Sequence, residues 1–188
     1  QIGSELCQRL RAEKDEGEVV ASDIREAGDE IMQSGPFELL DATDAHQLEE
    51  IVYHYNIDEI YLMAAMLSGK AETFPMKAWD LNMNTLFNVL NLAKEKKINR
   101  IFWPSSIAVF GPNTPKDNTS QHTIMDPSSV YGISKLTGER WCEYYHHRYD
   151  VDVRSIRYPG LISYATPPGG GTTDFSIELY EYALKDKP

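Results

Sequence analysis

A tyrosine and a lysine that could carry proton-transfer chemistry stand four residues apart, at Tyr131 and Lys135. On a helix this spacing places both side chains on one face, about 5–6 Å apart at Cβ. A free tyrosine has a pKa of about 10, and a cation about 4 Å away at an effective dielectric constant of about 20 offers the roughly 4 kcal/mol needed to bring it near 7. Tyr131 is therefore a candidate general base activated by Lys135, the alternative being an ordinary surface pair on an amphipathic helix.

Two hydroxyls follow an apolar segment upstream of this pair, at Ser105 and Ser106. Ser106 is a neutral hydroxyl that could hold a reacting oxygen beside Tyr131, and Ser105 could contact the substrate. The alternative is that the two serines only cap the turn after the strand.

The elements that must position these residues alternate between short apolar runs and longer stretches of helical period, which predicts parallel strands joined by crossover helices. We predict strands over 18–23, 37–41, 60–65, 99–104 and 151–156. We predict helices at the N-terminus, after a cap at Asp44, over 75–96 and over 130–149, with a long surface loop over 111–127. The fold class is α/β, with an open, doubly wound parallel sheet.

Ligands of such sheets bind outside the carboxyl ends of the strands. Four polar positions fall at predicted strand ends: Asp23, Asp41, the serine pair and the loop after Ile156. We expect them to converge on a single cleft.

Composition narrows the classes of function. The chain has 188 residues and a formal net charge of -11, from 18 Lys and Arg against 29 Asp and Glu. This length suits one domain, and this acidity argues against nucleic acid as a general partner. No apolar run approaches the roughly 20 residues of a membrane span, and no signal peptide is evident. Cys7 and Cys142 lie far apart, without metal-ligand spacing, and indicate reduced thiols in a cytoplasm-like compartment and no metal site.

The strand-end serine, the long loop and the Tyr-x-x-x-Lys helix together resemble the extended, epimerase-like branch of the short-chain dehydrogenase/reductase superfamily, over residues 3–185. The resemblance implies a Rossmann fold that binds NAD, with Ser106, Tyr131 and Lys135 as the catalytic residues. It also implies that Gln1, Ile2 and Gly3 end a glycine-rich turn. We therefore expect residues 1–188 to be an NAD-binding piece of a longer protein, truncated at both ends, without its first strand and its C-terminal substrate-capping portion.

Further cofactor contacts follow from the resemblance. Asp23 is expected to accept both ribose hydroxyls of adenosine, which favours NAD over NADP, with a turn aspartate as the alternative. The other implied NAD-binding residues, besides Tyr131 and Lys135, are Asp41, Met63, Ala64, Ala65, Asn82, Tyr158, Pro159 and Leu161.

Within this branch, the segments 62–68, 103–112 and 166–175 resemble the epimerase-like L-threonine 3-dehydrogenases. That likeness implies NAD-dependent oxidation of the threonine β-hydroxyl to 2-amino-3-oxobutanoate. The implied substrate-binding residues are Ser68, Ser105, Ser106, Tyr131, Thr172, Thr173 and Asp174. Thr173 or Asp174 could instead be a simple helix cap.

Two rival functions stay open, a sugar-nucleotide epimerase and a non-catalytic NAD-sensing or scaffold protein. We also expect, from the resemblance, a homodimer in the cytoplasm, or in the mitochondrion if the source is a eukaryote, with no nucleic-acid or membrane partner.

Overall fold

The computed structural model describes residues 2–13, 19–162 and 174–185. The chain divides into two compact units, each assembled from three separate segments. Unit 1 comprises residues 1–64, 84–103 and 145–154, and unit 2 comprises residues 65–83, 104–144 and 155–188.

Unit 1 contains the parallel strands that the apolar runs predicted. Strand β1 (Ala21–Asp23) pairs with β2 (Phe37–Leu39), and β3 (Glu59–Tyr61), β4 (Arg100–Phe102) and β6 (Asp152–Arg154) form a second sheet in the order β3-β4-β6. All of these pairings are parallel, and Ile101 lies between Ile60 and Val153. All five predicted strands are present, although each is shorter than predicted.

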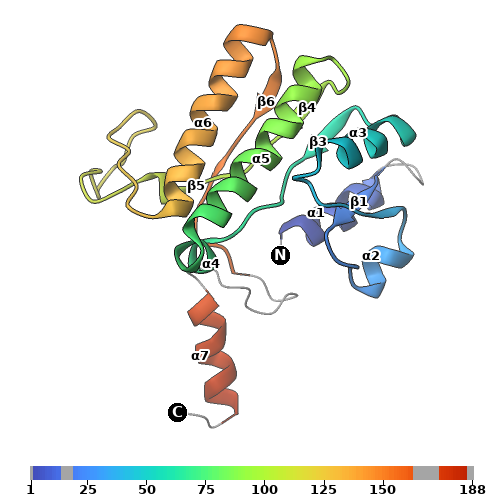
Figure 1. Ribbon diagram of the computed structural model, residues 1–188. Coiled ribbons are helices and arrows are strands. Elements are labelled where there is room, and N and C mark those ends of the chain that lie inside the picture. The colour runs from blue at the N-terminus through green and yellow to red at the C-terminus, as the bar shows by residue number, and fades with distance from the viewer. Residues whose placement is uncertain (1, 14–18, 163–173, 186–188) are drawn as a thin grey trace. The chain divides into compact units, whose positions relative to one another are not determined.

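Three helices belong wholly to unit 1: α1 (Ile2–Glu13), α2 (Asp29–Gln33) and α3 (Ala45–His54). The predicted cap of α3 is confirmed, because the Asp44 carboxylate accepts the N–H groups of His46 and Gln47 at 3.0 and 3.1 Å. Figure 1 shows α1 and α2 close to β1. Arg11 of α1 donates to the carbonyl oxygen of Ile31 at 2.6 Å, which ties α1 to α2.

Unit 2 contains a short parallel pair, β5 (Ser105–Ser106) with β7 (Arg157–Tyr158), and the short helices α4 (Ser68–Thr73) and η1 (Ile107–Val109). Helix α7 (Asp174–Leu184) also belongs to it. The serine pair was predicted to follow a strand, whereas it forms a strand of its own. Neither α4 nor β7 was predicted, because each is too short to display a period.

The two long helices are α5 (Pro75–Lys94) and α6 (Val130–Tyr149), and both contribute residues to each unit. The observed bounds of α6 coincide with the predicted 130–149. The most deeply buried large apolar side chains of unit 1 are on α5, β4 and the residues leading into β4 and β6: Leu86, Val89, Leu90, Ile98, Ile101 and Val151. Burial of each Leu or Ile contributes about 1.5–3 kcal/mol, so these residues supply much of the energy that holds the elements in place.

The predicted loop between η1 and α6 has no helix or strand, but it is closed at its base. The Thr114 hydroxyl, which is buried, donates to the carbonyl oxygen of Ile124 at 2.7 Å and accepts the N–H of Gly111 at 2.9 Å. The Asp126 carboxylate accepts the side-chain amide of Asn113 at 2.7 Å. These bonds fix both ends of the loop next to the first turn of α6.

Candidate active site

Ser106, Tyr131 and Lys135 come together in unit 2. Tyr131 and Lys135 lie on the first turns of α6, and Ser106 ends β5. The Ser106 oxygen accepts the N–H of Ala108 at 3.1 Å, which leaves its own proton for the hydrogen bond it makes with the Tyr131 hydroxyl. The Lys135 ammonium lies 5.5 Å from the centre of the Tyr131 ring. The predicted trio is thus one local cluster.

The electrostatics of the cluster differ from the sequence expectation. Burial raises the pKa of Tyr131 above its usual value, and the hydrogen bond from Ser106 lowers it in part. Lys135 is only 4% exposed, and burial lowers its pKa to about 8. Its amine donates to the carbonyl oxygen of Pro104 at 2.6 Å. The group that stabilises the Tyr131 phenolate in this structure is therefore Ser106 and not Lys135.

A glycine that the sequence reasoning passed over allows Tyr131 to approach Ser106. A Cβ atom on Gly132 would lie 2.2 Å from the carbonyl oxygen of Ala108, well inside van der Waals contact. Only glycine lets the first turn of α6 pack this closely against the residues that follow Ser106.

Asn82, one of the implied NAD-binding residues, belongs to a buried hydrogen-bond network within unit 2. Its side-chain oxygen accepts the N–H of Met66 at 2.7 Å, and its amide donates to the Ser134 hydroxyl at 3.2 Å. Ser134 in turn donates to the carbonyl oxygen of Tyr131 at 2.8 Å. Asn82 therefore links the chain before α4 to the turn that carries Tyr131, which makes its role one of support.

Ser105 has a different environment from its neighbour. It is 2% exposed, and its hydroxyl donates to the Glu139 carboxylate at 2.6 Å. Glu139 also binds Arg157 of β7 at 2.7 Å. This arrangement favours a structural role for Ser105 over the predicted substrate contact. Sequence reasoning missed Glu139, although its position four residues after Lys135 was a usable signal.

The other predicted substrate-binding residues are Ser68, Thr172, Thr173 and Asp174. Ser68 begins α4 and is half-buried. Thr172 and Thr173 lie outside the described residues, and Asp174 is the first residue of α7.

The predicted NAD-binding residues of unit 1 gather at the start of α1 and at strand ends; Gln1 lies outside the described residues. Gly3 lies in the first turn of α1, which Ile2 begins, and a Cβ atom there would lie 3.7 Å from that of Met63. The first N–H groups of a helix lack partners within it and suit a phosphate. Asp23 ends β1 with an exposed carboxylate that accepts the N–H of Arg25 at 3.2 Å. These donors and acceptors fit the phosphate and ribose of a dinucleotide.

Asp41 is committed to its own turn. One carboxylate oxygen accepts both the N–H and the hydroxyl of Thr43, at 2.9 and 2.7 Å, and these bonds lower the pKa of Asp41. A contact between Asp41 and the cofactor stays a prediction, as it does for Ala64 of unit 1 and for Ala65, Tyr158, Pro159 and Leu161 of unit 2.

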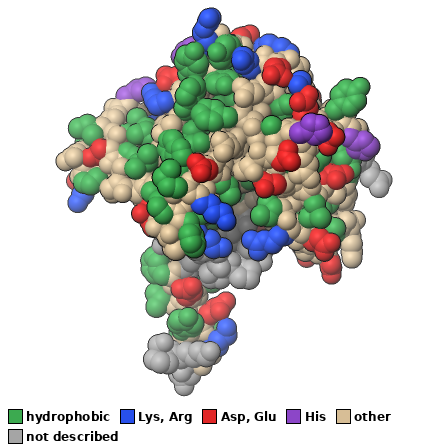
Figure 2. Space-filling view, viewed as in Figure 1, with side chains coloured by type: hydrophobic (Ala, Val, Ile, Leu, Met, Phe, Trp, Pro, Cys, Tyr) green, Lys and Arg blue, Asp and Glu red, His purple; other side chains and the backbone are tan. Residues whose placement is uncertain are grey.

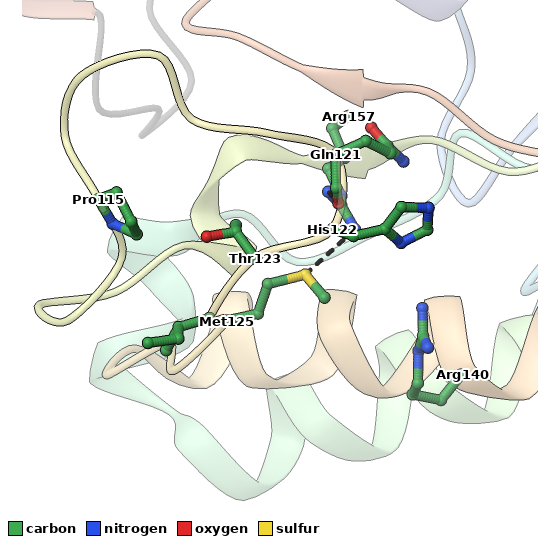
Figure 3. A pocket seen from close by; sticks show the side chains of 8 residues that line it. Pro115, Gln121, His122, Thr123, Met125, Arg140 and Arg157 are labelled. Carbon is green, nitrogen blue, oxygen red and sulfur yellow. Dashed lines mark hydrogen bonds between the residues drawn. The ribbon is translucent and has the colours of Figure 1, made fainter.

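A cavity of about 570 Å³ lies elsewhere in unit 2, between the long loop and α6. It is lined by Pro115, Gln121, His122, Thr123, Ile124, Met125, Arg140 and Arg157. Figure 3 shows Arg140 extending from α6 toward the loop, and the bond from Arg157 to the Met125 sulfur. No predicted site residue lines it. Among the described residues, no group of three or more His, Cys, Asp or Glu side chains could hold a metal ion.

The family model of the NAD dependent epimerase/dehydratase family matches residues 1–187. The chain belongs to this family. A relative, an uncharacterised epimerase/dehydratase of Staphylococcus saprophyticus, is 47% identical over 99% of this chain and 58% of its own length.

Solved structures agree with this family assignment. The holo form of a GalE-like L-threonine dehydrogenase from Cupriavidus necator has a TM-score of 0.93 at 48% identity, over 100% of this chain and 60% of its own. The L-threonine dehydrogenase of Clostridium difficile has a TM-score of 0.93 at 50% identity, over 99% of this chain and 58% of its own. The predicted Rossmann-like fold is confirmed. The chain spans about three fifths of the length of these relatives.

Proposed function

We propose that this chain carries the NAD-binding and proton-transfer residues of an enzyme that oxidises L-threonine at its β-hydroxyl. The observation that supports it best is the clustering of Ser106, at the end of β5, with Tyr131 and Lys135 on the first turns of α6, where the Lys135 ammonium lies 5.5 Å from the centre of the Tyr131 ring. A half-buried phenol whose pKa is raised by burial and lowered in part by a neighbouring hydroxyl, with an amine beside its ring, suits removal of a proton from an alcohol. The 48–50% identity to two L-threonine dehydrogenases supports threonine as that alcohol.

In the proposed reaction, Tyr131 as phenolate takes the proton of the β-hydroxyl while Ser106 holds the same oxygen. When bound, NAD accepts the hydride from Cβ, so the carbon is oxidised to a ketone and the cofactor is reduced. Lys135 would contact the nicotinamide ribose, while Ser106 is the group that favours the phenolate. The product is 2-amino-3-oxobutanoate.

Asp23 would set the choice of cofactor. A carboxylate accepts hydrogen bonds from both ribose hydroxyls and repels a 2′-phosphate, so we propose NAD over NADP. Ser68, Thr172, Thr173 and Asp174 are proposed to recognise the ammonium and carboxylate of threonine. The homodimer and the cytoplasmic or mitochondrial location stay predictions.

The test is the variant Tyr131→Phe in the purified protein that contains this chain. NADH production from threonine and NAD should fall by at least about 10²-fold, because the general base is lost while the ring remains. The Kd for NAD should stay within about twofold of wild type, since the variant retains Lys135, the residue proposed to contact the nicotinamide ribose. The measurements are absorbance of NADH and calorimetric titration with NAD.

Tyr53→Phe is the matched control, since Tyr53 is 89% exposed, and it should keep full turnover. Threonine oxidation unchanged in Tyr131→Phe would contradict the proposed base. Epimerisation of a UDP-sugar without any threonine oxidation would favour the rival epimerase instead.

A further inference from the structure

Glu139 forms a bidentate ion pair whose partners all lie in unit 2. One carboxylate oxygen accepts Nε of Arg157 and the other accepts Nη2, each at 2.7 Å. The first of these oxygens also accepts the Ser105 hydroxyl at 2.6 Å. Such a fork-to-fork pair fixes direction as well as distance, because both groups are planar.

The Glu139–Arg157 ion pair is largely buried and makes further contacts with its surroundings. The Glu139 and Arg157 side chains are only 10% and 13% exposed. Arg157 lies 5.4 Å from the centre of the Phe110 ring and donates to the Met125 sulfur at 3.1 Å, the bond drawn in Figure 3. Burial raises the pKa of Glu139, but the hydrogen bonds from Arg157 and Ser105 outweigh it and leave that pKa below its usual value. The carboxylate is thus charged and immobile at neutral pH.

The partners of Glu139 are the residues next to the candidate site. In the β5–β7 pair, Ser105 lies opposite Arg157, and Ser106 is the next residue of β5. Glu139 stands on α6, two turns after Tyr131. The Glu139 side chain therefore binds both strands of the β5–β7 pair, and β5 ends at Ser106. Glu139 also belongs to α6, the helix that carries Tyr131.

We propose that Glu139 is a positioning residue which, through Ser105 and Arg157, fixes the Ser106 hydroxyl against Tyr131. This inference rests on the proposed function of the site. A hydroxyl–hydroxyl bond is sensitive to displacements of a fraction of an ångström, and a misplacement of about 1 Å from a distant change can cost about 10²-fold in rate. Without the Glu139–Arg157 ion pair, the links between α6 and the residues flanking β5 would include the hydrogen bond from Lys135 to Pro104 and the close contact between Gly132 and Ala108.

The experiment compares Glu139→Gln and Arg157→Lys with wild type in the threonine assay. Glu139→Gln removes the charge and Arg157→Lys removes the fork, so each should lower kcat by about 10- to 100-fold while the KM for NAD changes by less than about twofold. The acidic limb of the pH profile, along which Tyr131 loses its proton and becomes an active base, should move to higher pH, because a displaced Ser106 no longer stabilises the Tyr131 phenolate.

Two controls separate positioning from mere loss of stability. Glu143→Gln breaks an ion pair with Arg140 on the same helix, 2.8 Å long but exposed, and should leave kcat and the pH profile unchanged. Val52→Ala opens a cavity at a buried residue of unit 1, so it should lower the Tm without moving the pH profile. Wild-type kcat and pH profile in Glu139→Gln, or an equal shift in Val52→Ala, would overturn the inference.

A second readout does not depend on threonine being the substrate. The ultraviolet titration of Tyr131, taken as the difference between each protein and its Tyr131→Phe derivative, should move to higher pH in Glu139→Gln. If wild type produces no NADH from threonine, the proposed substrate fails while this titration still tests the positioning role. An identical Tyr131 titration in both proteins would refute it.

Discussion

At the scale of single residues, Lys135 is the side chain under the strongest constraint. Its side chain is almost fully buried, its pKa is lowered to about 8, and its amine donates a hydrogen bond to the Pro104 carbonyl oxygen at 2.6 Å. Burial of a charged amine costs free energy, which the fold must offset elsewhere. Such an arrangement is typical of residues retained for chemistry, since a methionine of similar length would pack there without this cost.

We therefore predict that Lys135→Met stabilises the protein while it abolishes turnover. A folded-state pKa near 8 lies below the ordinary 10.5, so the unfolded chain binds more protons between these values and wild-type stability rises with pH across that window. The stabilisation by Lys135→Met should be up to about 3 kcal/mol below pH 8 and should shrink toward pH 10. Urea unfolding at pH 7 and pH 10 measures it.

Lys77→Met serves as the reference, because Lys77 is exposed on α5. The effect of Lys77→Met on the free energy of unfolding should not fall between pH 7 and pH 10. A Lys135→Met effect that is equal at both pH values would show that burial does not depress the pKa of Lys135.

At the scale of elements, the close packing of α6 on the segment after β5 decides the site geometry. Gly132 is the contact point, since its Cα approaches the Ala108 carbonyl too closely for any side chain. The approach of the Ser106 hydroxyl on β5 to the Tyr131 hydroxyl on α6 depends on this spacing.

Gly132→Ala should accordingly cost about 1–3 kcal/mol of stability and most of the activity, because the added methyl forces α6 away from Ser106. Gly28→Ala is a matched control: no atom lies within 4 Å of the added Cβ, and its φ of -65° suits alanine. Gly28→Ala should change the free energy of unfolding by less than about 1 kcal/mol. Thermal unfolding and NADH production check both, and full activity in Gly132→Ala would contradict the account.

The elements that the sequence predicted well are those whose signal repeats. The helix over 130–149 and the strands around Ile60, Ile101 and Val153 show a clear period or apolar run. Strand β7 has only two residues, and its pairing opposite Ser105 depends on contacts far apart in sequence. For that reason the cluster of Ser106, Tyr131 and Lys135 was predictable, whereas the Glu139–Arg157 pair and the bond from Lys135 to Pro104 were not.

At the scale of the whole molecule, each compact unit is built from three stretches of chain. Strand β3, near the end of the first stretch, pairs with β4 of the second, and β4 pairs with β6 of the third. On the face shown in Figure 2, acidic and basic side chains are interspersed. No helix in the described part of the chain has the length and apolarity to cross a membrane.

We predict that a peptide of residues 1–64 does not fold alone. It contains β3 but lacks β4, so the N–H and C=O groups of β3 have no ladder and Ile60 has no neighbour in Ile101. Circular dichroism should show no cooperative melting for the peptide, in contrast to the full chain. A sharp thermal transition in the peptide would contradict this dependence.

The loop before α6, whose base is closed by hydrogen bonds, offers a site for attaching a tag. Bonds from Thr114 to Ile124 and from Asn113 to Asp126 close the stem of the loop. The tip around Asn118 is exposed, and its left-handed backbone, with a φ of 52°, tolerates glycine readily. A short flexible tag or a fluorophore attached there would report on the protein in a gel or a microscope while the bonds that close the stem stayed in place.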